Sequence, residues 1–142
     1  METVDIIMQA NEIWDLWSQM WNGNLDKADL IVEDGFYPNL LSDQPVKAIE
    51  VNNPEKVKEW VTIIRNKFQT LKYETLAGPF VDEKQSVLCC HWKATGIFSG
   101  NTDIPVDIPG TSFLIEGTDI IKFREGKIYE CWTQSGLVTR NK

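Results

Sequence analysis

The hydrophobic pattern changes period midway along the sequence, and this change is the strongest constraint on the fold. In the second half, four segments rich in β-branched and aromatic residues predict consecutive strands. These segments are 72–81, 86–98, 112–124 and 127–138. Glu125-Gly126 predicts a two-residue hairpin turn, and the polar segment 82–85 predicts another. Strands joined by such short turns pair antiparallel.

The first half carries helical signals instead. Apolar residues recur at helical spacing over 4–21, and Asn22-Gly23 ends this helix because glycine readily adopts the left-handed conformation of a helix cap. A second, short helix is predicted over 25–32, and the following Glu33-Asp34-Gly35 ends it. Asn53-Pro54-Glu55 begins a third helix, which the apolar pattern extends to about Gln69.

The connecting segments have weaker signals. Residues 36–41 are aromatic and contain a proline, which predicts irregular structure, and 46–51 predicts a short strand. The segment 100–110 has two prolines and no period, which is typical of a loop that can cover the mouth of a pocket. Helices followed by long antiparallel strands indicate an α+β domain, in which the strands curl and the helices fill the concave face around a cavity.

Size and charge limit the partners. A chain of 142 residues has the size of one domain, so 1–142 is expected to fold as a single unit. The net charge of -7 argues against binding to nucleic acid, which needs a basic face, but not against a neutral or cationic small molecule. No apolar run is long enough for a membrane helix, and the N-terminus lacks the pattern of a signal peptide.

The cysteines and the histidine indicate neither a cofactor nor a metal. Cys89 and Cys90 are adjacent and point to opposite faces of a strand, so they do not easily bridge, and reduced thiols fit a cytoplasmic protein. His91 is the single histidine of the chain, which excludes a metal site built on several histidines. The sequence has no glycine-rich phosphate loop and no Ser-His-Asp arrangement.

Five segments of the sequence together match a known family pattern. They are EIWDLWSQMWNGN, EDGFYPNLL, NPEKVKEWVTIIRNKF, VLCCHWKATGIFSG and IPGTSFLIEGTDIIKFREGKIYECWT. The matching positions in the strands include Trp92, Gly96, Gly117, Asp119 and Trp132. Over nearly its whole length the chain resembles the SnoaL-like polyketide cyclase family of the nuclear transport factor two-like superfamily.

The resemblance implies a fold and an assembly. The expected fold is a cystatin-like α+β barrel, in which a cone-shaped, curled, mostly antiparallel sheet and three helices from the N-terminal half enclose a pocket. The expected assembly is a homodimer formed through the sheet. The superfamily includes cyclases, isomerases, dehydratases, epoxide hydrolases and non-catalytic binders, so the resemblance does not identify the reaction.

The chain departs from the family at its catalytic positions. The resemblance places Thr133 where the cyclases have the aspartate that acts as general acid and base, and Cys131 where they have a histidine. His91 stands in place of a strand arginine, and Phe98 in place of a pocket histidine. A threonine hydroxyl has no useful pKa for removing a carbon-bound proton at neutral pH, so the family's proton chemistry does not carry over at Thr133.

Asp119 and His91 are the candidate catalytic residues. Cyclisation and isomerisation need a base beside a carbonyl, and burial in an apolar pocket raises the pKa of a carboxylate such as Asp119 toward the working range. Alternatively, Asp119 is a structural partner of a backbone amide or an arginine. The pKa of an imidazole lies near neutrality, but His91 can equally lie on the outer face of the sheet or at a dimer interface. Strand alternation allows only one of His91 and Trp92 to face inward.

The chain contains six tryptophans, enough to line a flat, apolar pocket for an aromatic or polycyclic ligand. Tryptophans at helical spacing are equally typical of an ordinary core. Tyr37 and Gln134 are candidate hydrogen-bond donors, although Tyr37 can instead pack over the helices and Gln134 can face water. The candidate ligand-binding residues are Trp14, Trp17, Tyr37, Trp60, Trp92, Phe98, Trp132 and Gln134.

Three functions remain open on the sequence. The first is a cofactor-free cyclase, isomerase or related lyase acting on a small, hydrophobic, carbonyl-bearing compound of polyketide or terpenoid type, with Asp119 or His91 as base. The second is a non-catalytic protein that binds a small molecule, which the threonine at position 133 favours. The third is an interaction module whose working surface is the outer face of the sheet.

Overall fold

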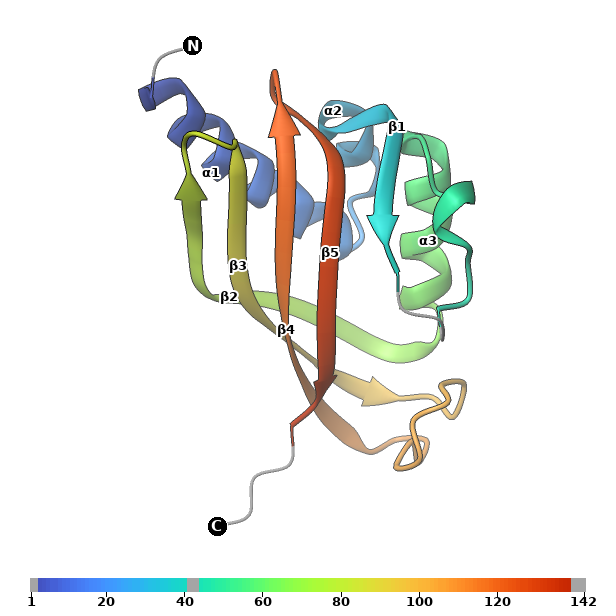
Figure 1. Ribbon diagram of the computed structural model, residues 1–142. Coiled ribbons are helices and arrows are strands. Elements are labelled where there is room, and N and C mark those ends of the chain that lie inside the picture. The colour runs from blue at the N-terminus through green and yellow to red at the C-terminus, as the bar shows by residue number, and fades with distance from the viewer. Residues whose placement is uncertain (1–2, 41–43, 139–142) are drawn as a thin grey trace.

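The computed structural model describes residues 3–40 and 44–138, and its central element is a five-stranded sheet (Figure 1). The strands lie in the order β1-β5-β4-β3-β2, and the sheet does not close into a barrel. Among the strands in the described residues, only β1 and β5 pair in parallel. The strands are β1 (Val32–Asn39), β2 (Phe68–Asp82), β3 (Val87–Phe98), β4 (Ser112–Arg124) and β5 (Lys127–Leu137).

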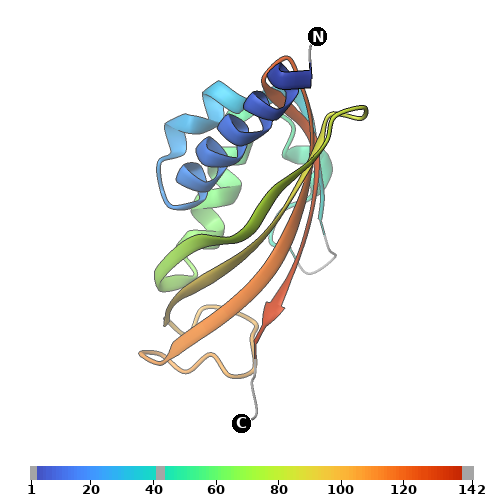
Figure 2. The same ribbon diagram turned by 90° about the vertical axis from the view of Figure 1, so that its left-hand side faces the viewer.

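Three α-helices lie on one side of the curved sheet (Figure 2). They are α1 (Thr3–Trp21), α2 (Ala28–Ile31) and α3 (Pro54–Arg65), and the 3-10 turns η1 (Leu25–Lys27) and η2 (Ala48–Glu50) precede α2 and α3. The hydrophobic core lies between these helices and the inner face of the sheet. The predicted α+β class and the curled sheet are therefore confirmed. None of the helices in the described part of the chain is long and apolar enough to cross a membrane.

Local sequence signals explain most element ends. Gly23 follows α1 with a φ of 113°, and the Asn53 side chain accepts a hydrogen bond from the Lys56 backbone N–H at the start of α3. Glu125 and Gly126 have φ values of 51° and 77°, as a two-residue hairpin turn requires. The predicted loop over 100–110 is also present, at the far end of the β3–β4 hairpin (Figure 1).

The predicted second helix is present as η1 and α2, which end at Ile31. Three sequence predictions are wrong at the level of elements. The stretch that follows α2 is not irregular, because Val32–Asn39 forms the parallel edge strand β1. The third helix ends at Arg65 rather than near Gln69, because the chain enters β2 at Phe68. The predicted strand 46–51 contains the 3-10 turn η2. Residue 41, at the end of the stretch predicted as irregular, lies outside the described residues.

The cap of α3 gives a direct test of this local structure. Asn53→Ala is expected to lower the free energy of unfolding by about 1 kcal/mol, because the Lys56 backbone N–H loses its acceptor. Asn53→Asp keeps an acceptor oxygen and is expected to retain most of the stability. Urea unfolding of the two variants measures the difference, and an equal loss in both would contradict the role of the Asn53 side chain as a cap.

Candidate functional site

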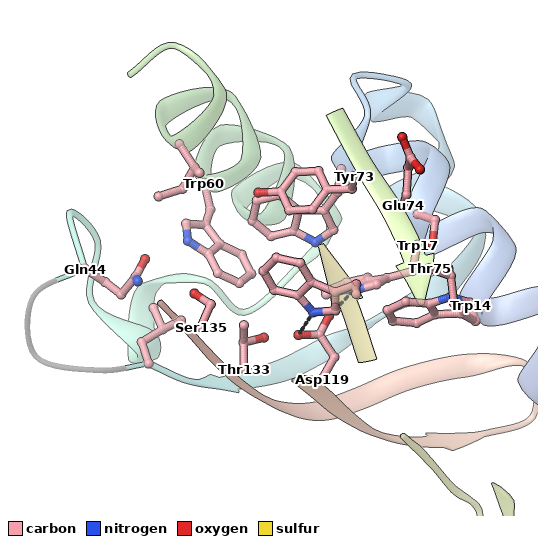
Figure 3. A pocket seen from close by; sticks show the side chains of 15 residues that line it. Trp14, Trp17, Gln44, Trp60, Tyr73, Glu74, Thr75, Asp119, Thr133 and Ser135 are labelled. Carbon is pink, nitrogen blue, oxygen red and sulfur yellow. Dashed lines mark hydrogen bonds between the residues drawn. The ribbon is translucent and has the colours of Figure 1, made fainter. Parts of the chain in front are cut away.

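A cavity of about 120 Å³ lies between α1, α3 and the inner face of the sheet (Figure 3). Every strand of the antiparallel part of the sheet contributes to its lining, because alternate residues of each strand face the helices. The lining residues are Trp14, Trp17, Ser18, Trp21, Leu40, Gln44, Trp60, Ile64, Tyr73, Glu74, Thr75, Trp92, Asp119, Thr133 and Ser135.

Aromatic rings in edge-to-face contact form much of the cavity wall. The ring centroids of Trp21 and Trp60 are 4.9 Å apart, those of Trp21 and Tyr73 are 5.6 Å apart, and those of Tyr73 and Trp92 are 5.3 Å apart. Trp17 meets Trp21 in the same way. Such contacts stabilise aromatic pairs beyond the area that they bury, so the wall is a packed assembly of rings with defined orientations.

The carboxyl group of Asp119 lies in this aromatic surrounding. Asp119 is in the middle of β4 and is 5% exposed. Its Oδ2 accepts a hydrogen bond of 3.1 Å from Trp17 Nε1, and its Oδ1 accepts one of 3.0 Å from Trp92 Nε1. The Thr133 side chain, directly opposite on β5, also hydrogen-bonds to the carboxyl group. All three donors are neutral groups.

Asp119 has no cationic partner in the cavity. Among the described residues that line it, none is a lysine, an arginine or a histidine. Burial raises the pKa of the Asp119 carboxyl above its ordinary value, and the hydrogen bonds from Trp17, Trp92 and Thr133 offset part of this rise. A buried carboxyl group without a counter-charge, exposed to a cavity, has the properties of a general acid or base.

Several other polar groups in the cavity can donate hydrogen bonds. Burial raises the pKa of the Tyr73 hydroxyl, which therefore stays protonated at neutral pH and can donate. Trp14 Nε1 donates to the Thr75 hydroxyl at 2.8 Å. The buried Trp60 Nε1 has no acceptor among the described residues. Figure 3 shows the Glu74 side chain directed away from Asp119.

The cavity contains five of the candidate catalytic and ligand-binding residues that the sequence singled out. They are Trp14, Trp17, Trp60, Trp92 and Asp119, which come from four separate elements of the fold. Asp119 lies on the inner face of β4, because Ile121 and Phe123, at two-residue spacing from it, are buried along with it. Trp92, rather than His91, is the inward residue of its pair.

His91 lies on the outer face of the sheet and cannot act in the cavity. Its Nε2 is 3.1 Å from Glu116 Oε1, and its side chain is 44% exposed. Trp132 and Gln134 also lie on the outer face, beside Ile120 and Lys122. The reason is alternation, because the inward residue of β5 opposite Asp119 is Thr133, and its neighbours in sequence must point outward.

Tyr37 and Phe98 are also outside the cavity. Tyr37 is 45% exposed on β1, between the buried Phe36 and Pro38. Phe98 is buried near the loop end of the β3–β4 hairpin, where it packs against Phe68 and Phe113. No residue of 100–110 lines the cavity in the described part of the chain, so this loop does not cover the cavity mouth.

Sequence reasoning missed Tyr73, Thr75 and Ser135 as lining residues. The pattern did contain a signal for Tyr73 and Thr75, because they follow the buried Leu71 at two-residue spacing along β2. Ser135 similarly follows Thr133 on β5. Within the described residues, no three His, Cys, Asp or Glu side chains gather as metal ligands would.

No protein-family model matches the sequence, and no curated protein shows significant sequence similarity to it. Solved structures do match. A candidate SnoaL-like polyketide cyclase from a Jannaschia species has a TM-score of 0.71 at 15% identity, over 92% of this chain and 87% of the other. A candidate polyketide cyclase from Acidithiobacillus ferrooxidans has a TM-score of 0.69 at 20% identity, over 89% of this chain and 87% of the other. AclR, a candidate hydroxylase from Streptomyces galilaeus, has a TM-score of 0.64 at 13% identity, over 92% of this chain and 90% of the other.

These matches confirm the predicted fold, which is that of the SnoaL-like polyketide cyclases with their nuclear transport factor two-like architecture. They extend over most of both chains, so the resemblance includes the helices as well as the sheet. Because the matched proteins include both candidate cyclases and a candidate hydroxylase, the shared fold does not identify the reaction.

The raised pKa of Asp119 predicts how stability depends on pH. On unfolding, the carboxyl group regains its ordinary pKa of 3.8, so the native state holds the proton more tightly than the unfolded state. Relative to Asp119→Asn, the wild type should therefore lose free energy of unfolding as the pH rises from 3.8 through the raised pKa. Urea unfolding of both proteins from about pH 3 to about pH 7 measures this difference. A relative stability that rises with pH in this window would contradict it.

Proposed function

We propose that the protein is a cofactor-free enzyme that performs acid–base chemistry on a small, apolar, carbonyl-bearing compound, with Asp119 as the base. One observation carries the proposal: a buried carboxyl group, with no cationic partner among the described residues that line the cavity, lies in an aromatic surrounding. Burying a carboxylate without a counter-charge costs several kcal/mol in effective desolvation free energy, and chemistry at the site is a reason to retain it.

The proposed first step is removal of a proton from the carbon beside the carbonyl. The Asp119 carboxylate takes the proton, and the electron pair of the broken C–H bond moves toward the carbonyl oxygen to form an enolate. A donor in the cavity stabilises that oxygen, and the protonated Tyr73 hydroxyl is suited to this role. Return of the proton to a different carbon gives isomerisation, whereas attack of the enolate on a second carbonyl gives cyclisation.

The size of the cavity supports a small reacting group. An engineered apolar cavity of about 150 Å³ holds a molecule of benzene, so a cavity of about 120 Å³ admits roughly one ring. A polycyclic compound would have to extend beyond the part of the cavity enclosed by the described residues. We therefore propose a single-ring ketone, or one ring of a larger molecule, as the part of the substrate that reaches Asp119.

A second candidate function is binding without catalysis. It is supported by Thr133, which stands where the resemblance implies a catalytic aspartate, and by the hydrogen bonds that already occupy both oxygens of Asp119. A stoichiometric small molecule in an organic extract of the folded protein, detected by mass spectrometry, would support tight binding. Its scaffold would distinguish a cargo from a reaction product.

Hydrogen–deuterium exchange beside the carbonyl tests the proposed base without knowledge of the natural substrate. In D₂O the wild type is expected to accelerate loss of the α-proton NMR signal of cyclohexanone or acetophenone. Asp119→Asn is expected to lower this rate by about 10²-fold or more, because the amide cannot accept the proton. Exchange that persists unchanged in Asp119→Asn would exclude Asp119 as the base.

Matched controls separate loss of the base from general damage. Glu116→Gln makes the same change of carboxyl to amide on β4, but Glu116 lies on the outer face, beside His91. His91→Gln removes the other base that the sequence suggested. Both variants are expected to retain the exchange rate of the wild type, and a large loss in either would place the base elsewhere.

We also propose a homodimer formed through the outer face of the sheet, as the resemblance implies. This face carries the 40% exposed Ile120 with the half-buried Trp132 beside it. Ile120→Glu is expected to shift the protein from dimer to monomer in sedimentation velocity, because it buries a charge at the contact. Ile49→Glu, the same change at an exposed residue of η2, serves as the control. A wild-type protein that sediments as a monomer would exclude the dimer.

A further inference from the structure

Trp92 and Gly117 face each other across β3 and β4, and their packing is unusually close. In the register of the two strands the two residues are direct partners. A Cβ atom added to Gly117 would lie 2.3 Å from Trp92 Cζ2 and 2.7 Å from both Cε2 and Cη2. Real Cβ atoms essentially never approach a ring atom this closely, so any side chain at position 117 would displace the indole.

This close packing lets the indole reach Asp119. Trp92 lies over the β4 backbone at Gly117, and its Nε1 extends along the strand to Asp119, which is two residues further on the same face. The second oxygen of the carboxyl group accepts the hydrogen bond from Trp17 of α1. Dashed lines in Figure 3 mark these two hydrogen bonds at the labelled Asp119 carboxyl group. One indole from the sheet and one from a helix therefore hold the two oxygens.

The two indole bonds favour the ionised form of the carboxyl group. A carboxylate accepts hydrogen bonds on both oxygens, whereas the protonated acid gives up acceptor capacity on one of them. The neighbouring ionisable groups do not supply a counter-charge. Burial raises the pKa values of Tyr73 on β2, Cys89 and Cys90 on β3, and Cys131 on β5, so all four groups are neutral at neutral pH. Arg65 of α3 donates to the backbone carbonyls of Trp21 and Leu71.

We propose that Trp92 and Gly117 are positioning residues for Asp119: the glycine admits the indole, and the indole, together with Trp17, orients the carboxyl group and favours its ionised form. The two indoles offset part of the cost of burying the carboxyl group with neutral hydrogen-bond donors, without a positive charge. The link to turnover rests on the proposed function, whereas the effect on ionisation can be measured without it.

The ionisation of Asp119 can be followed directly by NMR. Protein labelled with ¹³C at the aspartate carboxyl carbons is titrated, and the Asp119 signal is identified by its loss in Asp119→Asn. In Trp92→Phe the titration midpoint is expected to rise by about one pH unit or more, because a hydrogen bond to the charged form is lost. Gly117→Ala is expected to raise the midpoint in the same direction. An unchanged midpoint in Trp92→Phe would overturn the proposal.

Two further comparisons separate positioning from a merely structural role. The double variant Trp92→Phe with Gly117→Ala should shift the midpoint no further than Trp92→Phe alone, since both changes act on one hydrogen bond. Gly136→Ala is the matched control, because Gly136 is on the neighbouring strand β5 and an added Cβ would meet no atom within 4 Å. Loss of stability with an unchanged midpoint would assign the pair a structural role only. If Gly117→Ala does not fold, the titration midpoint of Asp119 in Trp92→Phe alone tests the proposal.

Failure of this proposal and failure of the proposed function give different results. If the enzyme assignment holds, the acidic limb of the exchange rate should move to higher pH in Trp92→Phe by the same amount as the NMR midpoint. A midpoint that shifts in a protein with no exchange activity would support the positioning pair and contradict the enzyme. Exchange that depends on Asp119, with a titration midpoint unaffected by Trp92→Phe, would support the enzyme and contradict the positioning role of Trp92 and Gly117.

Discussion

The hydrogen bonds between the Asp119 carboxyl group and two indoles connect the helical layer to the sheet. Trp17 and Asp119 are 102 residues apart in sequence, so their bond fixes α1 over the centre of β4. The interaction also requires the surrounding structure, since an aspartate buried among aromatic rings would be strongly destabilising without donors on both oxygens. The orientation of Trp17 and Trp92, and with it much of the cavity wall, follows from this polar contact in an otherwise apolar core.

Alternation along the strands decides which residues belong to the site. A shift of one position moves a side chain to the opposite face of the sheet, so Trp92 and Thr133 face the cavity while their neighbours His91 and Trp132 lie outside it. The outer face of the sheet consequently carries the contact between His91 and Glu116, an exposed isoleucine and a tryptophan contacted by a lysine. The inner face carries the buried carboxyl group, and the two faces are suited to different roles.

The sequence predicted the elements with strong local signals and failed where tertiary contacts decide. The four long strands, the Glu125-Gly126 turn and the capped start of α3 all rest on local chemistry, and all were found. β1 was missed because Gly35 and Pro38 are typical of irregular structure, and the segment becomes a strand only by pairing with the distant β5. The faces of β3 and β5 could not be predicted either, since apolar or aromatic residues occur on both sides of these strands.

The proposed role of Asp119 as the base does not require a second carboxyl group at position 133, where the resemblance implies an aspartate. Asp119 and Thr133 are direct partners across β4 and β5, so their backbones lie about 5 Å apart. A threonine at position 133 removes a second carboxyl group that would repel the first, and its hydroxyl hydrogen-bonds to the one that remains. A base on β4 rather than β5 would meet the substrate from a position displaced by one strand, next to Trp92. The reacting carbon would then have to lie against the indole rings of the sheet and α1, which agrees with a narrow cavity that admits a flat ring.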